Sequence, residues 1–147
     1  MGEFRAQRLA SRCISMPTPR SDADRAAIAW ACEMTTLESA AESMSDRYVA
    51  WADFDAMLAD MPGELARVAA HFGFEAEPAT LHAITAGPIM SRYSKDPSYE
   101  YTPKLRKDLL AQEEQLQGHE IDAALAMLRS SAEKSPLLAR ALARAED

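Results

Sequence analysis

The chain has 147 residues, of which 48% are hydrophobic, so it is long enough to bury a core and is not composed like a disordered protein. Its net charge of −7 and its pI near 5.0 argue against a surface that binds nucleic acid or anionic membranes as a whole. Only 5 residues are glycine, while alanine, leucine and methionine are common, and this composition favours helix over sheet.

The sequence predicts a cytoplasmic protein with a single domain over residues 1–147. No apolar run reaches the ~18 residues that a membrane helix needs, and the N-terminus lacks the apolar core of a signal peptide. Because no export signal is present, we expect Cys13 and Cys32 to be reduced thiols. Cys32 lies in an alanine-rich segment, and we expect it to be a small core residue.

Helix signals begin near the N-terminus. A basic helix is expected over Phe4–Ser15, ended by Pro17. Ser21 followed by Asp24 resembles a capping box, which predicts a helix from Asp22 to about Ser43. An apolar stripe on this helix is interpreted as a packing face. Its members are Trp30, Met34, Leu37, Ala41 and Met44.

The segment after this helix changes character. Tyr48–Trp51 is rich in aromatic and β-branched residues and is predicted to be a short strand. A lone strand leaves its backbone groups unpaired, so we expect it to border a sheet whose other strands are not in this chain. Asp53 is a candidate N-cap for a helix over Phe54–Ala59. Pro62 is expected to start the next helix, and Gly73 to end it.

Three further helices are expected in the remainder of the chain. One begins at Glu77-Pro78 and ends at Gly87-Pro88, and the residues from Ile89 to Tyr101 are expected to be irregular. Thr102-Pro103 starts a long helix, in which Gly118 predicts a kink or a break. Ser135-Pro136 starts the last helix. The predicted fold class is therefore mainly α, with six or seven helices and the strand-like segment Tyr48–Trp51.

The residues from Ile89 to Arg106 are the strongest candidate for chemistry. Cations, hydroxyl groups and aromatic rings alternate there, ahead of a helix N-terminus. This combination suits an anionic ligand with a flat ring, because cations and free N–H groups bind phosphate oxygens and tyrosine stacks on a base. The alternative is an ordinary solvated loop with weak surface ion pairs. Counted from Arg92 to Lys107, the cations are Arg92, Lys95, Lys104, Arg106 and Lys107, and the tyrosines are Tyr93, Tyr99 and Tyr101.

Two blocks of the chain resemble sulfotransferases. In the first, a strand-like run is followed by Ala52-Asp53-Phe54-Asp55, then Met61-Pro62, then an apolar helix that closes on His-Phe-Gly-Phe at 71–74. The second block, from Arg92 to Arg106, is similar to the C-terminal segment of a bacterial group of sulfotransferase-like proteins. The resemblance covers about Ser21 to Leu128. It implies the C-terminal part of an α/β P-loop-type fold.

The resemblance also implies a cofactor, 3′-phosphoadenosine 5′-phosphosulfate. In sulfotransferases a basic C-terminal loop closes over the nucleotide of this cofactor, and its arginine and lysine contact the 3′-phosphate. Carried over to this chain, Arg92 and Lys95 are the phosphate contacts and Ser94 is a hydroxyl donor. Tyr93 or Tyr99 is the aromatic neighbour. The loop differs from the better-known Arg-Lys-Gly form of the family.

The family's sulfate-binding loop, a Pro-Lys-Ser-Gly-Thr type turn, has no counterpart in the sequence, and no Gly-x-x-x-x-Gly-Lys pattern occurs. The resemblance therefore implies a C-terminal half that is not catalytically competent alone, and no catalytic residue is assigned. No metal site is expected either, because His71, His82 and His119 are scattered without ligand spacing.

Two alternatives remain open from the sequence. One is a small helical interaction module without catalysis, which binds a partner or a second copy of itself through the unpaired edge of Tyr48–Trp51. The other is a fragment of a longer gene with no independent function.

Overall fold

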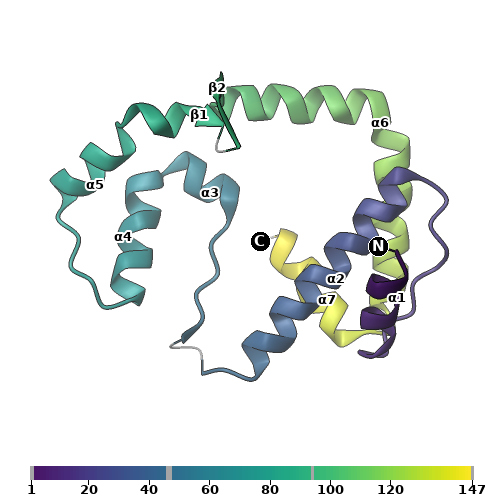
Figure 1. The fold of residues 1–147 in the computed structure, drawn as a ribbon. Helices are drawn as coiled ribbons and strands as arrows, with labels where there is room; N and C mark the ends of the chain where they lie inside the picture. Colours follow the sequence, from purple (N-terminus) through teal and green to yellow (C-terminus); the bar gives the residue numbers. More distant parts are fainter. Residues whose placement is uncertain (1, 46–47, 94, 147) are drawn as a thin grey trace. The chain divides into compact units, whose positions relative to one another are not determined.

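The computed structural model describes residues 2–45, 48–93 and 95–146, and the described part is mainly helical (Figure 1). The predicted fold class, mainly α with six or seven helices, is confirmed. The α-helices are α1 (Gly2–Ala10), α2 (Asp22–Glu42), α3 (Phe54–Ala59), α4 (Met61–His71), α5 (Pro78–Thr85), α6 (Pro103–Ala132) and α7 (Pro136–Glu146). A 3₁₀ helix, η2 (Pro88–Ser91), precedes two strands, β1 (Arg92–Tyr93) and β2 (Asp96–Glu100).

Local capping determines where most helices begin, as the sequence predicts. The Ser21 side chain accepts a hydrogen bond from the backbone N–H of Asp24 at 3.1 Å, and α2 follows it. Asp53 caps α3 in the same way, accepting from Ala56 N at 2.6 Å. The predicted start of α4 at Pro62 is one residue late, because Asp60 is the cap and the helix begins at Met61.

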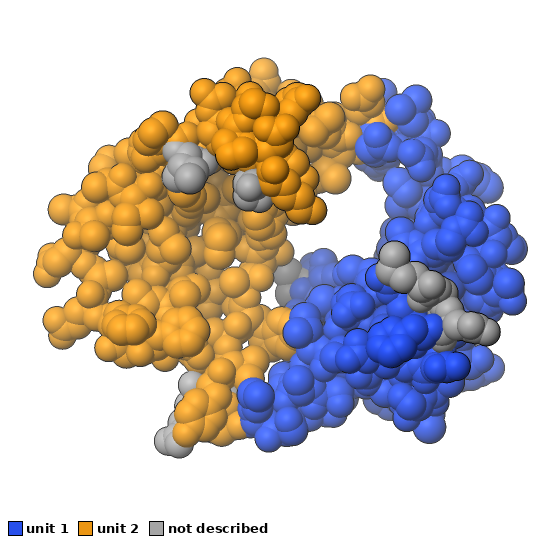
Figure 2. Space-filling model, viewed as in Figure 1, with its two compact units in different colours: residues 1–44, 113–147 blue, residues 45–112 orange. Residues whose placement is uncertain are grey.

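The chain forms two compact units (Figure 2). Unit 1 comprises Met1–Met44 and Glu113–Asp147, and unit 2 comprises Ser45–Gln112. The boundary between them falls within α6. The single domain expected over residues 1–147 stays a prediction.

Unit 1 has a small hydrophobic core built from α1, α2, α6 and α7. Its fully buried members include Cys32, as predicted, and the whole cluster is Leu9, Ile14, Ala31, Cys32, Leu128 and Leu138. Trp30 is only partly buried, at the margin of this cluster. The core is therefore made largely of small and aliphatic side chains, which lets the helices approach closely.

The buried face of α2 differs from the predicted apolar stripe. Leu37 and Met44 are 51% and 54% exposed, whereas Thr35 and Glu38 are buried. Glu38 is tolerated there because Arg144 of α7 donates two hydrogen bonds to its carboxylate. Pairing with α7 thus allows a charged residue on the buried face of α2, which the periodicity of apolar residues does not reveal.

Unit 2 is built from α3, α4 and α5, followed by the hairpin and the start of α6. Leu81 of α5 is its buried aliphatic side chain in the described residues. Gly73 ends α4 with φ +75°, as predicted, because a residue without Cβ adopts this left-handed conformation most easily. The Pro88 start of η2 likewise follows the predicted stop of α5 at Gly87.

The predicted strand at Tyr48–Trp51 is wrong. The Tyr48 N–H donates to Ser45 O at 2.8 Å in a turn, and residues 49–53 form no regular element. Strand-prone residues need a neighbouring strand to pair with, and the strands of the described chain pair elsewhere. The segment therefore provides no sheet edge for self-association.

Two other expectations also change. The stretch from Ile89 to Tyr101, expected to be irregular, contains η2 and the hairpin of β1 and β2. Of the kink or break predicted at Gly118, the break is absent, since α6 is continuous from Pro103 to Ala132. None of the helices in the described residues combines the length and apolar character that crossing a membrane requires.

Candidate functional site

The basic stretch folds as a β-hairpin in unit 2. Strands β1 and β2 are antiparallel, with Arg92 opposite Glu100 and Tyr93 opposite Asp96, and the register shifts between Arg92 and Tyr93. The Tyr101 N–H donates to Ser91 O at 2.8 Å next to the ladder. Every described hairpin residue from 92 to 100 is exposed. The hairpin therefore presents its side chains to solvent.

Arg92 and Lys95 are the two predicted phosphate contacts, and both lie on this hairpin with exposed side chains. Among the described residues neither forms an ion pair, although Glu100 is the cross-strand partner of Arg92. Ser94, the predicted hydroxyl donor, lies outside the described residues. The structure thus places two cations within four residues of each other, both available to an external anion.

The predicted aromatic neighbours lie on the same hairpin. Tyr93 is 38% exposed, and the centroid of its ring lies 5.9 Å from that of Tyr101, with the ring planes tilted by 41°. Tyr99 is 65% exposed. Tyr93 is therefore partly held by a ring contact. Tyr99 is the freer surface for a planar ligand.

Asp96, the first residue of β2, forms hydrogen bonds within its own strand. Its carboxylate accepts hydrogen bonds from the Ser98 hydroxyl at 2.6 Å and from the Ser98 N–H at 3.1 Å. These two bonds lower the pKa of Asp96 below its ordinary value, the hydroxyl contributing most. Asp96 is thus engaged by its own strand. Its negative charge still lies beside Lys95 in sequence.

Arg106 counts among the local cations in the sequence, but the structure shows that it has another partner. Its Nε donates to Asp55 Oδ1 at 2.7 Å, and its guanidinium lies 4.9 Å from the centroid of the Phe54 ring. The hydrogen bond to Asp55 raises the pKa of Arg106, and the same bond lowers that of Asp55. Arg106 therefore ties the first turns of α6 to α3 rather than facing a ligand.

The hairpin leads directly into the N-terminus of α6. The Leu105 N–H donates to Thr102 Oγ1 at 3.2 Å, which confirms Thr102 as the N-cap. Lys104 and Lys107 extend from the first turns and are exposed. The positive charge of the region thus lies partly on the hairpin and partly on the first turns of α6. The charge of Arg106 is neutralised by Asp55.

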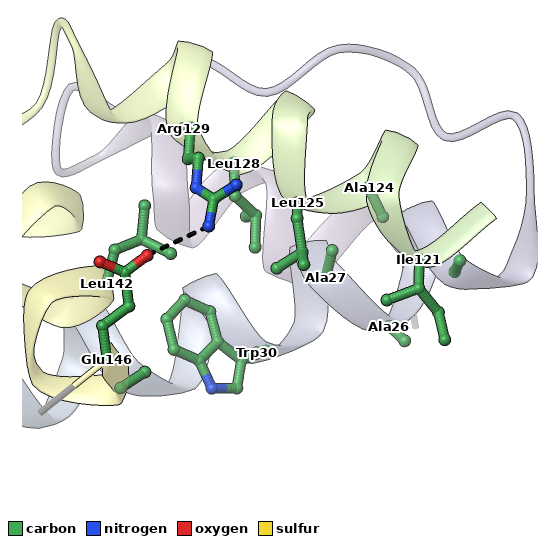
Figure 3. A pocket seen from close by; sticks show the side chains of 12 residues that line it. Ala26, Ala27, Trp30, Ile121, Ala124, Leu125, Leu128, Arg129, Leu142 and Glu146 are labelled. Atoms are coloured by element: carbon green, nitrogen blue, oxygen red, sulfur yellow. Dashed lines mark hydrogen bonds and ion pairs between the residues drawn. The ribbon is translucent and has the colours of Figure 1, made fainter. Parts of the chain in front are cut away.

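Unit 1 contains an apolar cavity that the sequence did not reveal. This α2–α7 cavity has a volume of about 500 Å³ and is lined by α2, α6 and α7. Figure 3 shows Leu125 and Leu128 of α6 facing the Trp30 indole of α2. At one end Arg129 donates to Glu146 at 3.2 Å, so the two charged lining residues neutralise each other.

Helical periodicity predicts that the lining residues of this cavity lie on apolar helix faces, but it does not predict which faces meet. Trp30, Leu125 and Leu142 come from three helices that are far apart in the sequence. Only the packing of α2, α6 and α7 brings them together. The signal available from sequence was the position of Trp30 on an apolar stripe.

No group of His, Cys, Asp and Glu side chains suited to a metal ion occurs among the residues for which coordinates are described. Comparison with models of protein families, with curated proteins and with solved structures gives no match to this chain. The resemblance to sulfotransferases therefore remains a prediction from the sequence.

Proposed function

We propose that the chain is a sulfotransferase-like protein whose hairpin contributes to binding 3′-phosphoadenosine 5′-phosphosulfate, without catalysing transfer by itself. The observation that carries the proposal is the pair Arg92 and Lys95, both exposed on one hairpin and free of ion pairs in the described residues. The cytoplasmic location expected from the sequence belongs to the same proposal.

The proposed chemistry is charge neutralisation and stacking. Arg92 and Lys95 attract the 3′-phosphate, and Tyr99 offers a ring face for the adenine. Glu100 and Asp96 oppose this attraction, since each lies beside one of the two cations in the ladder or in the chain. Binding is therefore expected to be weak and to fall steeply as salt is added.

The first test is a thermal-shift titration with 3′-phosphoadenosine 5′-phosphate, compared with AMP. A ligand that binds only the native state raises the melting temperature with its occupancy. A saturable rise with the bisphosphate, and a much smaller one with AMP, is the expected result. An equal response to both nucleotides would mean that no 3′-phosphate is recognised, and it would refute the proposal.

The matched variants are Arg92→Ala/Lys95→Ala and the control Lys104→Ala/Lys107→Ala, which removes the same charge from α6. An exposed charge pair contributes ~1 kcal/mol in water, so the loss of two such pairs predicts an affinity roughly 30-fold lower. Neither hairpin side chain is buried, so the melting temperature without ligand should not change. Equal losses in both double variants would assign the effect to overall charge.

A second candidate function, a helical interaction module, is favoured by one observation. Phe72 and Phe74 flank Gly73 at the end of α4 and are 68% and 69% exposed. Two large rings so exposed on a small unit are typical of a surface that another protein covers. Light scattering over a range of concentrations tests this, with Phe72→Ser/Phe74→Ser as the variant. A strictly monomeric wild type at high concentration would count against self-association.

A further inference from the structure

A second cavity in unit 1 is lined by α1, α2 and the segment that follows α1. This α1–α2 cavity has a volume of about 540 Å³. That volume falls within the ~300–1,000 Å³ typical of small-molecule sites. Its apolar wall includes Leu9, Ile14, Met16, Pro17, Pro19 and Ile28. The wall suits a hydrocarbon body.

The α1–α2 cavity differs from the α2–α7 cavity in the charge of its lining residues. Arg5 and Arg25 are its charged lining residues, and the lining includes no carboxylate from the part of the chain that the structure describes. In the α2–α7 cavity, by contrast, Arg129 is paired with Glu146 within the lining itself. An anion at the α1–α2 cavity therefore meets two guanidinium groups at the wall, whose carboxylate partners, Glu33 and Asp22, are not lining residues.

Arg5 and Arg25 each have a carboxylate partner, but both guanidinium groups can still bind an anion in the cavity. The distance from Arg5 Nε to Glu33 Oε1 is 3.9 Å, at the limit of an ion pair. Arg25 binds Asp22 at 2.8 Å, but in an exposed pair one turn apart on α2, which is worth little. A guanidinium has five N–H donors, so each retains donors for a further acceptor.

The surrounding segment is also positively charged. Arg8, Arg12 and Arg20 lie in the same stretch, between Arg5 and Arg25. Arg12 Nη1 is buried, and within the described residues it has no hydrogen-bond partner. The stretch from Arg5 to Arg25 contains five arginines against Asp22 and Asp24, so it is locally positive in a chain whose net charge is −7.

We propose that the α1–α2 cavity binds an amphipathic carboxylate, with its hydrocarbon chain against the apolar wall and its carboxylate at Arg5 and Arg25. A guanidinium binds a carboxylate through two parallel hydrogen bonds, which favours this head group over an alcohol. An amphiphile with a cationic head is repelled by the same residues. This proposal concerns unit 1 and does not depend on nucleotide binding by the hairpin.

The test is isothermal titration of the full chain with decanoate below its micelle concentration, beside decanol and decylammonium. One saturable decanoate site per chain is expected, with at least tenfold weaker binding of the alcohol and none of the cation. Equal binding of decanoate and decanol would overturn head-group recognition. Many weak, non-saturating sites would show detergent behaviour and would overturn the proposal as well.

Variants locate the site. Arg5→Gln/Arg25→Gln should weaken decanoate at least tenfold and leave decanol unchanged. The control Arg129→Gln/Lys134→Gln removes the same charge from unit 1 outside this cavity and should bind as wild type. Ala6→Trp, which fills the cavity from α1, should abolish binding of both ligands. If decanoate binding survives Ala6→Trp in a folded protein, or is lost in the control, the assignment to this cavity is wrong.

A second copy of the chain is the rival occupant of the cavity. Light scattering at the concentrations of the titration distinguishes it. A dimer that Ala6→Trp dissociates would assign the cavity to a protein interface and would overturn the small-molecule proposal.

Discussion

Replacing Leu138 with alanine tests the packing of unit 1 most directly. Leu138 is 0% exposed, lies in the first turn of α7, and belongs to the same buried cluster as Leu9 and Leu128. The change removes three carbon atoms, which at ~0.8 kcal/mol per buried methylene is about 2.4 kcal/mol before any cavity term. Residual cavity raises the expected loss of unfolding free energy to about 3 kcal/mol.

The magnitude stays near the lower end of the range for such changes because the surrounding core can relax. Leu128 lines the α2–α7 cavity and Leu9 lines the α1–α2 cavity, so two members of the cluster that contains Leu138 already border open space. Side chains that border open space can shift toward a new void more easily than side chains enclosed on all sides. A loss of about 3 kcal/mol is still a large fraction of the ~5–15 kcal/mol that stabilises a typical domain.

The assay is urea unfolding followed by far-UV circular dichroism, fitted with a common slope. Leu116→Ala is the matched control, since Leu116 lies on the same unit and is 70% exposed. The control should lose less than about 0.5 kcal/mol, as is usual for surface changes. A loss below about 1 kcal/mol for Leu138→Ala, or one equal to that of the control, would refute the buried cluster as the stabilising core.

Three further predictions concern local features. Gly73→Ala should destabilise unit 2 by about 1 kcal/mol through the left-handed conformation alone, because nothing would contact the new Cβ; an unchanged urea midpoint would contradict this. Ser135→Ala removes the acceptor for the Leu138 N–H and should cost about 1 kcal/mol in the same assay, whereas a neutral result would deny the cap a role. The Arg20 N–H donates to Asp24 at 2.8 Å and lowers the pKa of its carboxyl group. Ionised Asp24 therefore stabilises the fold above the unfolded pKa of ~4, and this contribution to the free energy of unfolding is lost as pH falls through the lowered folded pKa. The gap in melting temperature between wild type and Asp24→Asn should therefore narrow in acid, and a gap that is constant with pH would rule this linkage out.

The helix starts could be predicted because the signals for them are local. Ser21, Asp53 and Thr102 each accept a hydrogen bond from an N–H three residues along the chain, so a few consecutive residues contain both partners. Gly73 is similar, since its positive φ concerns its own backbone. These features specified a mainly helical chain without reference to any distant residue.

The strand prediction failed because strand formation depends on a partner. Tyr48–Trp51 has strand-prone residues but belongs to no strand of the described chain, whereas Asp96–Glu100 contains a proline and still forms a strand opposite β1. Pro97 is tolerated because a two-stranded sheet has free edges, where a missing N–H removes no ladder bond. Propensity alone therefore placed the strand in the wrong segment.

The candidate site divides in the same way. Its residue types, Arg92, Lys95 and the tyrosines, could be read from the sequence, because cations and rings lie in one short stretch. The ion pair of Arg106 with Asp55 could not be predicted from the sequence, because 51 residues separate the two. The two cavities of unit 1 depended entirely on which helix faces meet.

Local hydrogen bonds and turns were thus determined by the sequence itself, because their partners are neighbours along the chain. The tertiary structure decided which charges are neutralised and which remain for a ligand. Glu38 was buried only because Arg144 reaches it from α7, and Arg5 and Arg25 line one cavity only because α1 packs on α2. Contacts of this kind join residues far apart in the chain, and no short pattern contains both of them.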